Sequence, residues 1–224
     1  MVSNIQWEYI FDPLLAIRSV PYVMQGIGYT MLISLVSMVF GLFFSFFLAL
    51  GRMSDHLILQ LPSRLYISFM RGVPILVVLF LLYFGLPLIG IEFSAITAAI
   101  IGFSLNSAAY MAEINRSALQ AIERGQWEAA YTLGMNYWQT LTRIVLPQAT
   151  KIALPPLVNV LLDLIKSSSL AAMITVPELF QKAKIVGGRE LDYMTMYILV
   201  AFIYWGICSI VEVLQNRIEK QYNI

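Results

Sequence analysis

The chain has 224 residues, of which 59% are hydrophobic and 12% are charged, whereas a soluble domain carries about 25% charged residues. This composition excludes an ordinary soluble protein and places the chain in a lipid bilayer. A formal net charge of +1 gives no electrostatic reason to bind nucleic acid, and the single cysteine, Cys208, excludes a disulfide framework within the chain.

The predicted elements begin with residues 1–20, which alternate aromatic and polar side chains and indicate an interfacial elbow lying on the membrane. Acidic residues in this stretch argue against a cleavable signal peptide. A spanning helix needs about 20 apolar residues, and five segments meet this requirement: about 22–50, 65–88, 93–114, 151–176 and 193–214. We therefore predict an all-α integral membrane fold, with one transmembrane domain over residues 21–224.

Two of these spans have local features of their own. Small residues are frequent in the third span, which favours close helix packing and sliding. We expect the fourth span to be interrupted at Pro155-Pro156, because proline removes backbone donors from a helix.

Lysine and arginine positions predict the orientation, because cytoplasmic loops are enriched in these residues. The larger set lies close to span ends, in the loop after the first span, in the long loop and in the tail: Arg52, Arg64, Arg116, Arg124, Arg143, Lys151, Arg217 and Lys220. The smaller set lies on the other side: Arg18, Lys182, Lys184 and Arg189. With five spans, this bias predicts an external N-terminus and a cytoplasmic C-terminus. The loop at 177–192 is then the largest external feature and a candidate dock for an external partner.

The long loop, about 117–147, is too polar to remain in lipid and longer than a turn requires. Glu128-Ala129-Ala130 predicts a short helix with its acid in the first turn, where the helix dipole favours a negative charge. The two alanines leave a shallow face on which another protein can dock. Gly134 predicts a left-handed helix cap, and Pro147 predicts the start of the next span.

The pattern of this loop resembles the cytoplasmic coupling loop of ABC importer permeases. With five spans, the chain resembles a permease of the polar amino-acid uptake family. Further agreement lies in 69–76, 107–116, 146–149, 154–159 and 166–171, so the resemblance covers roughly residues 20–220. Two positions depart from the family pattern: Val73 stands where Thr is usual, and Ser167 stands where Asp is common.

The resemblance implies the type I ABC importer permease architecture in the cell (inner) membrane of a prokaryote. It implies a second permease subunit, two ATP-binding subunits that hold ATP and Mg, and an external solute-binding protein. It also implies that contact with the ATPase is made by the residues of the loop motif: Gly125, Glu128, Ala129, Ala130, Gly134, Leu146 and Pro147.

Polar residues inside spans are costly, at roughly 2.5–3.5 kcal/mol per charge, and usually face a cavity or a partner. Arg71 lies beside Gly72 and Pro74, where a proline is expected to kink the span. Two further sets share one helix face each by their spacing: Asn106, Tyr110 and Glu113 on the third span, and Asn159, Asp163 and Lys166 on the fourth. A zwitterionic amino acid needs a cation for its carboxylate and acceptors for its ammonium. Arg71 and Lys166 are candidates for the first role, and Asp163 and Asn159 for the second.

Structural interpretations of the same residues remain open. Glu113 and Arg116 can pair or cap near the cytoplasmic end. Asp163 and Lys166 can neutralise each other as an i, i+3 pair. Arg71 can extend toward the inner interface.

The leading hypothesis is a subunit of an ATP-driven importer of a polar amino acid, for example cystine, glutamine, arginine or histidine. A permease for an opine or another amino-acid derivative is the alternative. A membrane enzyme is disfavoured because no nucleophile–base set or metal-ligand cluster is evident, and no ATP-binding glycine-rich loop occurs in the chain. A self-sufficient channel or secondary transporter usually has more spans or internal repeats, and it has no use for a docking loop.

Overall fold

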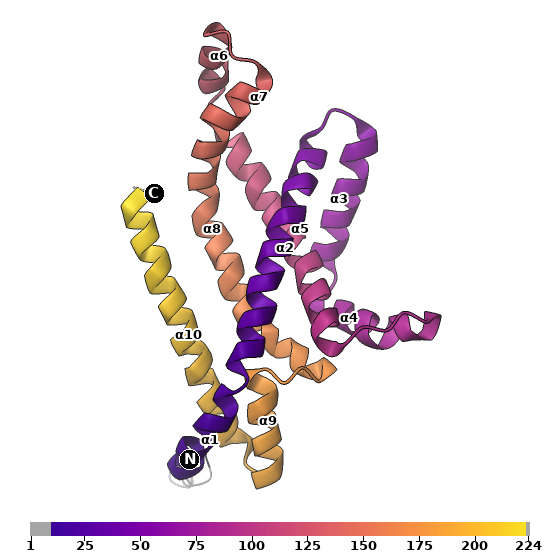
Figure 1. Ribbon diagram of the computed structural model, residues 1–224, viewed down its shortest axis with the longest axis vertical. Helices are drawn as coiled ribbons and strands as arrows, with labels where there is room; N and C mark the ends of the chain where they lie inside the picture. The colour runs from indigo at the N-terminus through magenta and orange to yellow at the C-terminus, as the bar shows by residue number, and fades with distance from the viewer. Residues whose placement is uncertain (1–9, 223–224) are drawn as a thin grey trace, which may run out of the picture.

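The computed structural model describes residues 10–222 and consists of helices and short connections (Figure 1). Most of the predicted elbow, residues 1–9, lies outside the described residues. The helices are α1 (Pro13–Met24), α2 (Ile27–Met53), α3 (Leu57–Gly72), α4 (Ile75–Phe80), α5 (Ala95–Gln120), α6 (Arg124–Thr132), α7 (Tyr137–Thr140), α8 (Leu146–Ser167), α9 (Leu179–Glu190) and α10 (Tyr193–Tyr222). Short π helices are η2 (Leu81–Gly85) and η4 (Leu141–Val145), and short 3-10 helices are η3 (Leu86–Ile89) and η5 (Ser168–Ile174).

Four helical stretches are long and apolar enough to cross a membrane: Ile27–Met53, Ala95–Gln120, Tyr137–Ile174 and Tyr193–Arg217. A fifth is a pair, Leu57–Gly72 and Ile75–Ile89, bent by 101° at its break. The all-helical membrane fold predicted from the sequence is therefore confirmed. Figure 1 shows α6 and α7 at one end of the molecule, and α1 with α9 at the other.

The second predicted span is broken and not a single straight helix. Val73 has extended backbone angles (φ −99°, ψ 131°), as expected for the residue before a proline. Because Pro74 has no N–H and blocks continuation of the helix, α3 ends at Gly72. The chain then leaves at a steep angle into α4.

Pro147 lies at the start of helix α8, as predicted, but the helical stretch continues back beyond it, and the predicted interruption of the fourth span was wrong. The helical stretch begins at Tyr137, ten residues before Pro147, because the π turn η4 joins α7 to α8 and accommodates the proline. Asn136 starts this stretch with a capping box in which its side chain accepts from the Gln139 N–H. Helix α8 also runs without a break through Pro155-Pro156.

The segment predicted as an external loop, 177–192, is largely the helix α9. Its inner face buries Leu179, Ala183 and Val186 against Val23 of α1 and Met196 of α10. The sequence contains an apolar residue every three to four positions here, which is the helical period that the loop interpretation overlooked.

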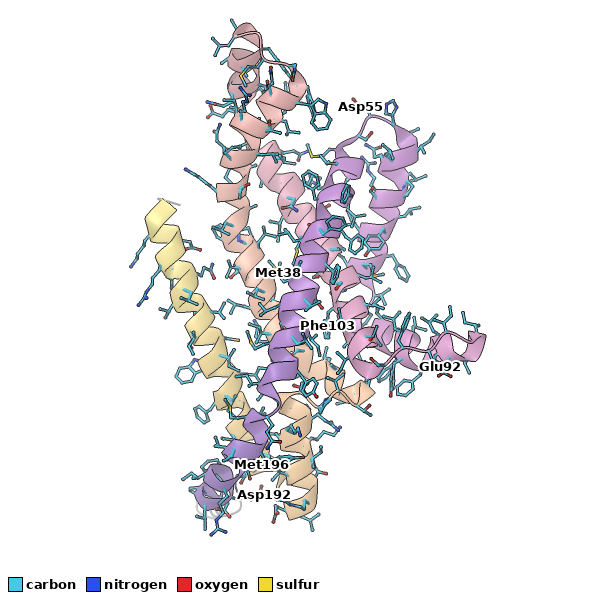
Figure 2. All side chains as sticks on the ribbon, in the orientation of Figure 1. Met38, Asp55, Glu92, Phe103, Asp192 and Met196 are labelled. Carbon is cyan, nitrogen blue, oxygen red and sulfur yellow. The ribbon has the colours of Figure 1, made fainter. Side chains whose placement is uncertain are left out.

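Helices α2 and α5 form the centre of the molecule (Figure 2). Alanines of α5 are fully buried beside Ile33 of α2, in agreement with the close packing expected from small residues. Side-chain hydrogen bonds join the two helices, from Ser37 Oγ to the Ile100 carbonyl at 3.2 Å and from Asn115 Nδ2 to Ser45 Oγ at 2.9 Å.

Gly26, between α1 and α2, provides a test of the packing at the α9 end. A Cβ added there would lie 2.5 Å from the backbone carbon of Glu178 and the backbone nitrogen of Leu179. Since backbone atoms cannot rotate away, Gly26→Ala is expected to destabilise the subunit by about 1–3 kcal/mol. The measurement is thermal unfolding in detergent. Gly28→Ala is the matched control, because nothing lies within 4 Å of its added Cβ and alanine favours a helix. Equal midpoints for both variants would contradict this packing.

Candidate functional site: a polar cleft and the α6 segment

A cleft of about 520 Å³ opens where α3 breaks, between this break, α5 and α8. It brings together four of the six residues predicted to line a pathway: Arg71, Asn106, Tyr110 and Asp163. The rest of its lining is Gly72, Val73, Pro74, Ile75, Phe103, Ser107, Val160, Leu164 and Ser167. The other two predicted residues, Asn159 and Lys166, are exposed on α8 and are not part of this lining.

Arg71 lies in the last turn of α3, where a cation is favoured by the helix dipole. Its guanidinium lies over the ring of Tyr110, 5.5 Å from the ring centroid. Among residues 10–222, no carboxylate pairs with it. Both of these side chains are exposed to the cleft, so the cation is held in place and remains available to an anion.

Asn106 satisfies a backbone carbonyl that loses its helical hydrogen bond where α3 is broken. In a continuous helix, the carbonyl of Met70 would accept from the N–H of residue 74, which is Pro74 and has none. The Asn106 Nδ2 donates to this carbonyl instead, at 2.9 Å. This bond uses one of the two N–H donors of the amide, and the side-chain carbonyl oxygen of Asn106 remains an acceptor at the cleft.

Asp163 and Lys166 form an ion pair, with Lys166 Nζ 2.8 Å from Asp163 Oδ1. The side chains are 71% and 58% exposed, respectively. An exposed pair of this kind contributes about 0–1 kcal/mol to stability. Both the pathway interpretation and the structural interpretation predict this ion pair, so its presence does not favour one of them over the other.

Glu113 is held between two arginines near the end of α5. Arg52 of α2 lies 3.0 Å from Glu113 Oε1, and Arg116 lies 3.1 Å from Oε2. The pairing of Glu113 with Arg116 expected from the sequence is therefore present, and Arg52 was not anticipated. Glu113 is not among the cleft residues.

Glu178 is a buried acid that the sequence reasoning did not single out. It caps α9, with Oε2 accepting from the Phe180 N–H at 2.8 Å and Oε1 from the Gln181 N–H at 2.7 Å. The hydroxyl of Tyr204 in α10 donates to Oε2 at 2.7 Å. Burial raises the pKa of Glu178, and the three donated hydrogen bonds oppose that rise only in part. The sequence does contain a signal for this cap, because the acid directly precedes Leu179-Phe180 and a run with apolar residues at the helical period.

The predicted docking segment is helical, but two details differ from expectation. Helix α6 begins at Arg124, so Glu128 lies in its second turn and not in its first. Ala130 is buried while Ala129 is exposed, so only one alanine contributes to an open face. Consecutive helical residues are about 100° apart, so the two alanines do not share one face of α6. Gly134 has φ +78°, and the left-handed cap predicted for it is confirmed.

Comparison with known proteins agrees with this architecture. Residues 41–224 match the family model of the binding-protein-dependent transport system inner membrane component. The chain is 69% identical over 222 residues to the probable amino-acid ABC transporter permease protein YckA of Bacillus subtilis (strain 168), covering 99% of this chain and 98% of that protein. It is 42% identical over 202 residues to the L-cystine transport system permease protein TcyB of the same organism, covering 90% and 86%.

Solved structures show the same arrangement of helices. An amino acid ABC transporter crystallised with histidines matches with a TM-score of 0.89 and 32% identity, over 94% of this chain and 98% of that chain. An inward-facing MetNI methionine ABC transporter matches with a TM-score of 0.74 and 19% identity, over 89% and 95%, which shows the fold alone.

The bent span, the polar cleft and the α6 segment define a permease subunit of an ABC importer. The chain belongs to the family of binding-protein-dependent transport system inner membrane components. The resemblance to amino-acid importer permeases is thus confirmed, and the chain is a component of a membrane transporter and not an enzyme. Among residues 10–222, no group of three His, Cys, Asp or Glu side chains is placed to hold a metal ion.

Proposed function

We propose that this subunit imports a polar amino acid and that the substrate passes through the cleft at the α3 break. The observation that carries the proposal is that Arg71 and Asp163, a cation and an anion from different helices, line the same cleft. A zwitterion needs this combination of charges. The names of the relatives YckA and TcyB, an amino-acid and an L-cystine permease, support the same substrate class.

Each group of the cleft has a role in this proposal. The Arg71 guanidinium binds the substrate carboxylate with two parallel hydrogen bonds, and stacking on Tyr110 keeps it oriented. Asp163 binds the ammonium through Oδ2, since Lys166 occupies Oδ1. The Asn106 side-chain carbonyl oxygen is a second acceptor for the ammonium, and the hydrogen bond from its nitrogen to the Met70 carbonyl holds the amide in place.

The partners follow from the family. We propose two permease subunits, two ATP-binding subunits that hold ATP and Mg, and an external solute-binding protein. The coupling surface consists of the exposed part of α6 and the chain that follows it: Gly125, Glu128, Ala129, Gly134 and Pro147, with Ala130 and Leu146 packed behind them. Motion driven by nucleotide reaches the cleft along the continuous helix from Tyr137 through Asp163 to Ile174.

The test is ATP-driven uptake into proteoliposomes by the purified importer with its solute-binding protein. Labelled cystine, glutamine, glutamate, histidine and lysine, and an unlabelled opine as competitor, form the panel. Accumulation of at least one amino acid that requires both ATP and the solute-binding protein is expected. If no amino acid accumulates and the opine competes strongly in the binding assays, the transported solute is an amino-acid derivative and not an amino acid.

We also propose an external N-terminus and a cytoplasmic C-terminus in the cell membrane of a prokaryote. The turn at Asp55 lies at the same end of the molecule as α6, and Glu92 lies in a different loop away from that end (Figure 2). Both side chains are exposed. In a Cys208→Ser background, Glu92→Cys is expected to react with an impermeant thiol reagent in intact cells, and Asp55→Cys only after lysis. The reverse pattern would invert the topology.

A further inference from the structure

A second cleft of about 670 Å³ adjoins the first one. It is lined by Arg52, Arg64, Ile67, Ser68, Arg71, Gly72 and Tyr110. Three of these residues, Arg71, Gly72 and Tyr110, also line the first cleft. The two clefts therefore meet at the broken end of α3, with the stacked pair of Arg71 and Tyr110 at their junction.

The second cleft has a different charge composition from the first. Its lining contains three guanidinium groups and no carboxylate, whereas the first cleft contains Asp163. Arg52 is engaged by Glu113, which Arg116 also binds. Within residues 10–222, Arg64 and Arg71 form no ion pair with an acid. The second cleft therefore attracts an anion and has no charged acceptor for a cation.

The position of the second cleft relates it to one end of the molecule. Arg52 lies in the last turn of α2, next to the turn at Asp55 and at the end where α6 is found (Figure 2). In the topology proposed above, this end is cytoplasmic. A solute that leaves the first cleft toward the cytoplasm thus meets the arginines after it has left Asp163.

From this juxtaposition we infer that the arginine cleft is the exit site of the subunit and that the transported amino acid carries no net positive charge. This inference rests on the function proposed above and narrows its substrate class to neutral and acidic amino acids. The carboxylate passes from Arg71 to Arg64, while the ammonium loses its charged acceptor, so the substrate binds weakly there and is released. An amino acid with a cationic side chain brings a second positive charge close to the guanidiniums of Arg64 and Arg71, which no acid neutralises among residues 10–222, and is repelled.

The experiment compares Arg64 variants of the complete importer in proteoliposomes, with labelled glutamine, glutamate and lysine as the probes. Wild type is expected to take up glutamine or glutamate at least about tenfold faster than lysine. Arg64→Glu is expected to lower uptake of the favoured probe about tenfold, with basal ATP hydrolysis unchanged. Lys151→Glu, an exposed cation of α8 outside both clefts, is the control and should transport as wild type.

Two further variants keep the test decisive if Arg64→Glu does not assemble. Arg64→Gln should lower uptake severalfold, and Arg64→Lys should restore it because the charge is retained. Lysine uptake equal to that of glutamine, or Arg64→Gln and Arg64→Glu equal to wild type, would overturn the exit site while leaving amino-acid import intact. Absence of uptake of every amino acid by wild type would instead count against the proposed function itself.

Discussion

Glu128→Arg is expected to abolish ATP-driven uptake while the subunit remains folded in the membrane. The Glu128 side chain is exposed on α6 and forms no ion pair among the described residues, so reversing its charge removes no internal contact. Its position in the second turn of α6 limits the influence of the helix dipole, and the expected loss therefore comes from charge mismatch with the surface of the ATP-binding subunit. The measurements are uptake and co-purification of the ATP-binding subunit.

Glu92→Arg is the matched control for this charge reversal. Glu92 is also exposed, but it lies in the loop before α5, away from α6 (Figure 2). It should keep the ATP-binding subunit and at least half of the wild-type uptake. Normal uptake and normal co-purification for Glu128→Arg would show that α6 does not contact the ATPase through this acid.

Asp163→Asn is expected to reduce substrate transport strongly with little effect on stability. Loss of a charge-assisted hydrogen bond to the ammonium weakens binding by roughly 1.5–3 kcal/mol. The ion pair with Lys166 is exposed, so its loss costs at most about 1 kcal/mol of folding free energy. Uptake kinetics and thermal unfolding in detergent measure the two effects separately.

The double variant Asp163→Asn with Lys166→Gln distinguishes the two interpretations of the pair. If Asp163 binds substrate, the double variant transports as poorly as Asp163→Asn alone. If Asp163 only neutralises Lys166, transport in the single variant is impaired by the unpaired Lys166, and the double variant, which removes that charge as well, recovers transport. That recovery would remove Asp163 from the substrate site.

Periodicity and spacing predicted part of the cleft lining, because they describe which residues share a face of one helix. Asn106 and Tyr110, four residues apart, do line one cleft, and Asp163 reaches it from α8. The same reasoning failed for Asn159, which shares a helix with Asp163 but lies outside the cleft lining. Helical spacing defines a face only to within about 100°, and the neighbouring helix decides which part of that face is used.

Other features depend on contacts between distant parts of the chain, which a local pattern does not contain. Pro74 predicted a kink in the second span, but the 101° bend and the replacement donor from Asn106 are tertiary features. Glu178 lies in the segment predicted as an external loop, yet it is buried, and Tyr204 and two backbone N–H groups satisfy its carboxylate there. Pro155-Pro156 predicted an interruption that the continuous α8 does not show.

The most direct test of the cleft as the substrate pathway is protection of single cysteines by the transported amino acid. In a Cys208→Ser background, Ser167→Cys places a thiol in the cleft lining, and Asn159→Cys places one on the same helix outside it. In the assembled importer, saturating substrate is expected to slow thiol modification at position 167 at least about tenfold and to leave position 159 unchanged. Equal modification rates at position 167 with and without substrate would contradict passage through this cleft.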